Sequence, residues 1–140
     1  MPIAKRHYRL KLADALSAHD RALRTGGLEG ILNPGLIESA IARPYIGYYP
    51  QIWQKAGALV QSMASNHGFA DGNKRTTLLL VHTLISNSGY QLKALNNEDL
   101  EQALEDIIVA GAGRETPLQQ VTEWFRLRVE RLTKPNKPLF

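Results

Sequence analysis

Residues 66–76 read Asn66-His67-Gly68-Phe69-Ala70-Asp71-Gly72-Asn73-Lys74-Arg75-Thr76 and join two strongly apolar helical patterns. A turn between helices can be closed with one Gly and one Asn, so the titratable, amide and cationic side chains gathered here indicate chemistry. We expect a helix to begin at about residues 72–73, directing its first backbone N–H groups and its positive dipole end at the space these side chains line. The turn therefore predicts an anion site that suits a phosphate.

Three side chains of this turn have separate expected roles in phosphoryl or nucleotidyl transfer. His67 is the candidate general base, because an imidazole titrates near neutrality and accepts a proton from an attacking hydroxyl; the alternative is a helix-capping residue. Asp71 is the candidate Mg²⁺ ligand, since Mg²⁺ takes one or two carboxylates plus substrate phosphates; the alternative is a helix N-cap. Phe69 is expected to anchor the turn by burying its ring.

The next four residues are expected to bind the nucleotide phosphates. Gly72 permits a tight turn and close phosphate approach. Asn73 either donates its amide to a phosphate oxygen or caps the helix, and Lys74 adds a cation. Arg75 offers a two-pronged phosphate contact. The alternative for Arg75 is an exposed charge in a first helical turn, where the dipole disfavours a cation.

The pattern His-x-Phe-x-Asp-Gly-Asn-Lys-Arg-Thr resembles the signature of the Fic/Doc superfamily, and the Lys after Asn resembles its Doc (death-on-curing) branch. Upstream segments resemble Doc-branch toxins in order and spacing: Ala18-His19-Asp20, Gly26-Gly27-Leu28, Gly35-Leu36-Ile37-Glu38-Ser39-Ala40 and Ala42-Arg43-Pro44. The resemblance covers most of residues 10–90. Within it, His19 is expected to be a structural hydrogen-bonding residue.

The resemblance implies a toxin of a toxin–antitoxin module, in a compact Fic/Doc-type helical bundle. Such a toxin, with Mg²⁺, moves the γ-phosphate of ATP to a threonine of translation elongation factor Tu and blocks translation. Its inhibitor is a cognate antitoxin. This agrees with the sequence, in which the one Ser/Thr-x-x-x-Glu-Gly/Asn match, residues 25–30, contains two glycines that make an inhibitory helix implausible.

Alternatives remain open at this point. Typical Fic proteins have a glycine at the position of Lys74 and transfer AMP, and Gly72 is retained where the Doc pattern has Ala. Adenylyl or nucleotidyl transfer is therefore the second reading, and a non-catalytic binding module is the third. The resemblance also implies a flap, here Arg43 with residues 45–49 and especially Tyr45, Gly47 and Tyr48, that docks the target chain as an added strand. The alternative for this segment is a plain surface loop.

The composition predicts a single small domain. With 140 residues and 44% hydrophobic content, one core is expected over residues 1–132, followed by a loosely ordered tail at 133–140. The absence of Cys excludes disulfides and thiolate sites. Neither a signal-peptide core nor an apolar run of about 18–20 residues is present, so a cytoplasmic protein without a membrane span is expected. The net charge of +4 suits an acidic partner or nucleotide, but the basic clusters lack interleaved aromatics, so direct nucleic-acid binding is not expected.

Hydrophobic periodicity predicts an all-α fold of about six helices. Helices are expected at about 12–25, 33–42, 51–66 and 73–87, the last being apolar nearly all round and therefore central. Tyr90–Leu92 reads as a short extended piece. A fifth helix is expected after caps at Asn96 and Asn97, stopped by Gly111 and Gly113, and a sixth from residues 116–117 to 132.

Overall fold

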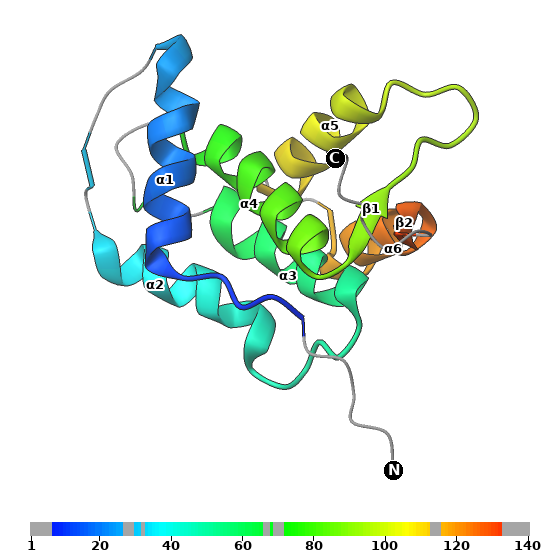
Figure 1. Ribbon diagram of the computed structural model, residues 1–140, viewed down its shortest axis with the longest axis horizontal. Coiled ribbons are helices and arrows are strands. Elements are labelled where there is room, and N and C mark those ends of the chain that lie inside the picture. Colours follow the sequence, from blue (N-terminus) through cyan, green and yellow to red (C-terminus); the bar gives the residue numbers. More distant parts are fainter. Residues whose placement is uncertain are drawn as a thin grey trace, which may run out of the picture.

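A computed structural model describes residues 7–26, 30–31, 33–65, 68, 72–112 and 116–132. The elements in chain order are α1 (Leu12–Ala22), the 3-10 turn η1 (Leu23–Thr25), α2 (Pro34–Ala42), the 3-10 turn η2 (Arg43–Tyr45), α3 (Ile52–Ala64), α4 (Asn73–Asn87), β1 (Tyr90–Leu92), α5 (Leu100–Ala112), α6 (Leu118–Arg128) and β2 (Val129–Arg131). The expected all-α class with six helices is confirmed, with a small two-stranded sheet added (Figure 1). The expected tail at 133–140 lies outside the described residues.

The buried side chains form one continuous core to which all six helices contribute. Figure 1 shows α3 and α4 side by side at the centre, with α1 and α2 on one side and α5 and α6 on the other. None of the helices in the described residues is long and apolar enough to cross a membrane.

The 73–87 helix, α4, is central as expected and packs against α1, α3, α5 and β1. The neighbouring helix α3 shares the centre. It packs against α2, α4, α5 and α6, and its small residues let these neighbours approach closely. A Cβ on Gly57 would lie 2.7 Å from Thr122 Oγ1, and a Cβ on Gly111 of α5 would lie 2.9 Å from Val60 Cγ1. Gly111 is therefore required for space. It was expected to stop the helix together with Gly113, but α5 continues one residue beyond it to Ala112, and Gly113 lies outside the described residues.

Two further element boundaries differ from expectation. The sixth helix ends at Arg128 instead of continuing to Leu132, because residues 129–131 pair antiparallel with β1, Tyr90 lying opposite Arg131. Backbone bonds from Lys93 N to Arg128 O (2.8 Å) and from Leu132 N to Gly89 O (3.1 Å) flank this ladder.

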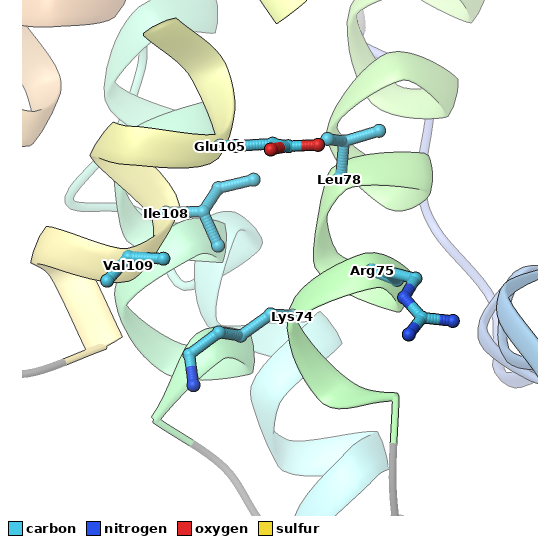
Figure 2. Close-up of a pocket in the computed structure, with 6 residues that line it drawn as sticks. All are labelled: Lys74, Arg75, Leu78, Glu105, Ile108 and Val109. Carbon is cyan, nitrogen blue, oxygen red and sulfur yellow. The ribbon is translucent and has the colours of Figure 1, made fainter. Parts of the chain in front are cut away.

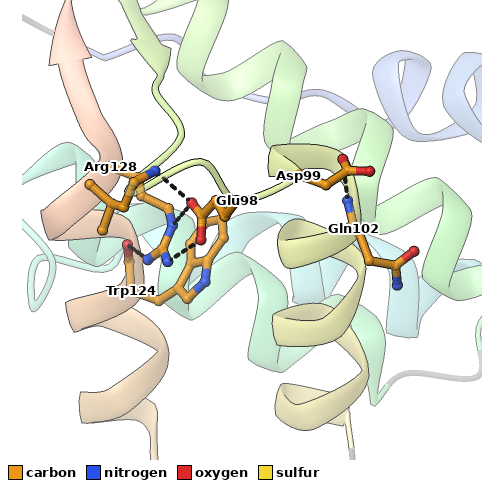
Figure 3. A network of polar contacts seen from close by, with 6 residues as sticks. Glu98, Asp99, Gln102, Trp124 and Arg128 are labelled. Carbon is orange, nitrogen blue, oxygen red and sulfur yellow. Dashed lines mark hydrogen bonds and ion pairs between the residues drawn. The ribbon is translucent and has the colours of Figure 1, made fainter.

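Asn96 and Asn97 do not cap α5. Their φ values of 48° and 64° place both in a left-handed turn, a conformation that Asn tolerates better than most residues. The cap is supplied by Asp99, whose Oδ1 accepts a hydrogen bond from Gln102 N at 3.2 Å. The turn itself is tied to α6 by the neighbouring Glu98 (Figure 3).

The Glu98–Arg128 pair is the least exposed ion pair of the described chain. Arg128 Nε and Nη2 donate to the two Glu98 carboxylate oxygens at 2.7 and 2.8 Å. The guanidinium also lies 4.2 Å from the centroid of the Trp124 ring and donates to Trp124 O at 3.1 Å. The Arg128 hydrogen bond, helped by Leu95 N, lowers the pKa of Glu98 from 4.5 to about 2. The pair fixes the end of α6 to the turn before α5.

Candidate functional site

The helix that follows the motif begins where the sequence predicted. Gly72 is the N-cap of α4 with φ +79°, and its carbonyl accepts the first helical hydrogen bond from Thr76 N at 2.9 Å. The N–H groups of a first turn have no carbonyl partner inside their own helix, and the dipole makes this end positive. The backbone thus has the arrangement that the predicted phosphate site requires, and phosphate binding itself stays a prediction.

The structure confirms the tight turn as one of the two expected reasons for glycine at position 72. A Cβ there would lie 3.4 Å from Leu23 Cδ2 and 3.6 Å from His19 Cδ2. The missing side chain therefore faces the C-terminal end of α1. Glycine is needed because of its positive φ, which costs an L-residue about 1–2 kcal/mol. Close approach of a phosphate to this glycine stays a prediction.

His19 is a neighbour of the motif that was not predicted to be a site residue. It lies on α1, only 6% exposed, with its ring against Gly72. The signal that could have found it is its place in the Ala18-His19-Asp20 segment. Its burial agrees with the structural role expected for it.

Arg75 is not an uncompensated charge. Its Nη1 donates to Ala22 O at 2.8 Å and to Gly26 O at 3.4 Å, at the end of α1 and just beyond. A cation is disfavoured at the N-terminus of its own helix but favoured at the C-terminus of another. Arg75 therefore joins the start of α4 to the carbonyl end of α1. Figure 2 shows its side chain extending away from α5.

Lys74 lies on the other side of the same helical turn. Together with Arg75, Leu78 of α4 and Glu105, Ile108 and Val109 of α5, it lines a hollow of about 230 Å³ (Figure 2). Lys74 is exposed, and no described residue forms an ion pair with it. The hollow thus offers an apolar wall with a cation at its rim, beside the positive end of α4.

The motif residues expected to perform the chemistry, His67, Phe69 and Asp71, lie outside the described residues. Gly68 between them is buried, and its carbonyl accepts a hydrogen bond from Asn33 N at 3.0 Å. The chain that enters α2 therefore runs beside the motif. This neighbour was not predicted, because the partners are separated by more than thirty residues.

The predicted flap residues Arg43, Tyr45, Gly47 and Tyr48 are not brought to the motif. They precede α3, whereas the motif follows it. A helix of the length of α3, 13 residues, separates its ends by about 20 Å. The structure therefore places this segment and Gly72, at the described end of the motif, at opposite ends of α3; target docking by the segment stays a prediction.

The described residues contain no group of three His, Cys, Asp or Glu side chains that could hold a metal ion. The expected Mg²⁺ would depend on Asp71, with oxygens of substrate phosphates completing its ligands. The described part of the site offers positive charge and the first N–H groups of α4, which suit phosphate oxygens and not a metal ion, with one carboxylate, Glu105, across the hollow. Mg²⁺ binding by Asp71 stays a prediction.

Comparison with known proteins gives two findings. The family model described as the Fic/DOC family matches residues 9–85 of the chain. The chain is also similar to the protein named Toxin Doc of Mycolicibacterium smegmatis, strain ATCC 700084 / mc(2)155. The two are 37% identical over 113 residues, which cover 77% of this chain and 83% of the relative.

Proposed function

The chain belongs to the Fic/Doc family, in its Doc toxin branch, and from this premise we propose that it is the toxin of a toxin–antitoxin module. Its activity is the transfer of the γ-phosphate of ATP to a threonine hydroxyl of a target protein, translation elongation factor Tu, which stops translation. Lys74, placed at the rim of the hollow beside the start of α4, is the observation on which the choice of phosphate rests.

The reaction follows from the roles assigned to the motif. His67 takes the proton of the threonine hydroxyl as its oxygen bonds to the γ-phosphorus, and the bond from that phosphorus to the oxygen of the leaving ADP breaks. The N-terminus of α4 and Lys74 hold the negative charge of the phosphates. Asp71 would hold Mg²⁺, which neutralises phosphate charge when bound.

Lys74 supports the kinase reading through its volume and its charge. A side chain at this position takes up room beside the helix start, where typical Fic proteins have glycine. The catalytic groups make no chemical distinction between phosphates, so the product depends on which phosphorus lies in line with the attacking oxygen.

The retained Gly72 had been the argument for adenylyl transfer. A Cβ at this position would lie against Leu23 and His19, so an alanine there would strain the turn through its positive φ but would direct its side chain at α1. This placement supports the kinase proposal by weakening its main objection. Nucleotidyl transfer remains the alternative that the experiment must separate.

The decisive experiment incubates the protein with elongation factor Tu and ATP labelled at either the α- or the γ-phosphate. We expect transfer of the γ-label only, and its loss in His67→Ala. Attachment of the α-label would replace the kinase reading with nucleotidyl transfer. Transfer to neither position by a folded protein would favour a binding module.

Lys74→Gly provides a second arm of the same assay. The variant should lose γ-phosphoryl transfer and gain slow AMP transfer, which mass spectrometry of the target distinguishes by the mass of the adduct. In cells, expression of the wild type should arrest growth, His67→Ala should be harmless, and co-expression of the cognate antitoxin should restore growth. Equal toxicity of the wild type and His67→Ala would contradict a catalytic mechanism. The proposed target places the protein in the cytoplasm.

A further inference from the structure

The loop between α2 and α3, residues 43–50, presents the two most exposed large hydrophobic side chains among the described residues. Tyr48 is 78% exposed and Ile46 is 56% exposed. Gly47 between them has φ +101°, a conformation that glycine adopts without strain. Neither side chain contributes to the core, so the fold alone does not account for their hydrophobic character.

This loop is nevertheless held firmly at both of its ends. At its start, Tyr45 Oη donates to Tyr8 O at 2.6 Å and accepts from Leu10 N at 2.9 Å. At its end, Lys55 Nζ donates to Tyr49 O at 2.7 Å. A surface that is already ordered loses less conformational entropy when it binds a partner. The exposed side chains Ile46 and Tyr48 are therefore carried by a loop that is already ordered before a partner binds.

Three cations surround the loop. The Arg9 guanidinium lies 5.0 Å from the centroid of the Tyr45 ring, and that of Arg43 lies 5.8 Å from the Tyr49 ring. Lys55 is the third. None of the three forms an ion pair with a described residue, because every ion pair in the described chain involves residues from 82 onward.

The carboxylate that influences this region, Asp14, is already engaged. Its Oδ2 accepts hydrogen bonds from Tyr8 Oη at 2.9 Å and from Lys11 N at 2.9 Å. Both donors are neutral, so Asp14 keeps its negative charge, and three cations against one carboxylate leave the region with net positive charge. By contrast, the cations Lys93, Arg126 and Arg128 on the other half of the molecule each face a glutamate.

We propose that residues 43–49, with Arg9 and Lys55, form a docking surface for a segment of a partner polypeptide that carries carboxylates beside an apolar side chain. The carboxylates would pair with the three cations, and the apolar side chain would cover Ile46 and Tyr48. Tyr and Arg are enriched among the residues that dominate binding energy at protein interfaces. The surface lies at the opposite end of α3 from the motif, so the partner would bind without covering the nucleotide site.

A single-stranded nucleic acid is a poorer match to this surface. Binding of successive bases requires successive aromatic faces along a basic groove. Here the rings of Tyr45 and Tyr49 are already covered by arginines, which leaves Tyr48 as the largely exposed ring of the three. A second copy of this chain could offer the exposed acidic residues of α5, Glu101, Glu105 and Asp106, and the test below separates this case.

The test measures binding of short fluorescent peptides by anisotropy. One peptide alternates Glu with Leu, and a second of equal length alternates Gln with Leu. We expect the acidic peptide to bind and the neutral one to bind at least tenfold more weakly. Tyr48→Ser, Ile46→Ser and Arg9→Gln should each weaken binding of the acidic peptide by about tenfold, the change that corresponds to about 1.4 kcal/mol.

Matched controls lie on the other half of the molecule. Leu127 is 43% exposed and Arg131 is exposed in β2, so Leu127→Ser and Arg131→Gln should leave binding of the acidic peptide unchanged. Circular dichroism verifies that every variant is folded. The proposal is overturned if neither peptide binds, if the neutral peptide binds equally, or if Tyr48→Ser binds like the wild type.

Two other measurements can also overturn it. Binding of a thymidine oligonucleotide that depends on Tyr48 more strongly than peptide binding does would assign the surface to nucleic acid. Self-association in analytical ultracentrifugation that Tyr48→Ser abolishes would assign it to a second copy of the chain. Because none of these readouts involves phosphoryl transfer, the result does not depend on the proposed function.

Discussion

Arg75→Ala distinguishes a structural role of this arginine from a role limited to phosphate binding. The guanidinium makes one hydrogen bond of 2.8 Å to Ala22 O and a longer one of 3.4 Å to Gly26 O. A hydrogen bond from a charged group contributes about 1.5–3 kcal/mol, with the lower end suiting an exposed side chain, and a cation at a helix C-terminus adds about 0.3–1 kcal/mol. Since only the first bond is short, we expect Arg75→Ala to lower the free energy of unfolding by about 1.5–2 kcal/mol.

The assay is urea unfolding followed by circular dichroism, in the absence of nucleotide. Lys74→Ala is the matched control, because Lys74 is exposed on the same turn and forms no ion pair with a described residue. It should change stability by less than about 0.5 kcal/mol. Titration calorimetry with ATP should rank the two variants in the opposite order: Lys74→Ala should lose about 1–3 kcal/mol of ATP-binding free energy, and Arg75→Ala should lose less. Wild-type stability of nucleotide-free Arg75→Ala would refute the proposed link between α4 and α1.

Three further changes test other parts of the structure. Gly57→Ala should lower the thermal midpoint, because the added Cβ would lie 2.7 Å from Thr122 Oγ1 and 3.1 Å from its Cα. Overpacking this contact of α3 with α6 costs about 1–3 kcal/mol, which outweighs the gain of about 1 kcal/mol in helix propensity. A raised midpoint would contradict this. Thr76→Val should stabilise the protein, since Thr76 Oγ1 is buried without a hydrogen-bond partner among the described residues. A methyl group of similar size removes a desolvation cost of about 1–3 kcal/mol. A lower free energy of unfolding in urea would instead reveal a hydrogen-bond partner. Pairing with Arg128 lowers the pKa of Glu98 from 4.5 to about 2, so the stability that this pair contributes is complete above the ordinary pKa and is lost as the pH falls toward about 2. Glu98→Gln should therefore make the free energy of unfolding less dependent on pH in this acidic range. An unchanged pH dependence would count against the pair.

The parts of the fold that the sequence predicted correctly depend on local hydrogen bonding. Asn33 caps α2, accepting from Leu36 N at 3.2 Å, and Pro34 occupies the first helical position. Gly72 likewise turns the chain immediately before α4. Such signals lie within three or four residues of the boundary they define, so the sequence contains them directly.

The parts that were missed depend on partners far apart in the chain. β2 exists because β1 offers an edge, with Glu130 opposite Gln91, and a helical pattern continues through these residues when the pairing is not known. The contact of Arg75 with Ala22 spans 53 residues. Its cationic character was visible in the sequence, but the carbonyl end of α1 that compensates it was not.

The candidate site was likewise predicted only in part, because some of its features are local in sequence and others depend on distant partners. The start of α4 and the place of Lys74 beside it follow from the motif alone. The neighbours that complete the site, His19 of α1 and the α5 side chains Ile108 and Val109, are set by helix packing. Arg43 and Tyr48 were assigned to a target-docking flap from a resemblance in sequence order, which contains no information on distance; the structure places them before α3, and their docking role stays a prediction.

The rigidity of α3 sets a minimum length for any ligand that engages both of its ends. Its ends are about 20 Å apart, and an extended chain covers about 3.3–3.6 Å per residue. A polypeptide reaching from the Tyr48 loop to the motif therefore needs at least about six residues between its two contact points, and more if it follows the curved surface. Two weak segments joined by such a linker would gain affinity through effective concentration, whereas a shorter linker would gain nothing. Partner length, and not only partner chemistry, thus becomes a criterion for what this protein binds.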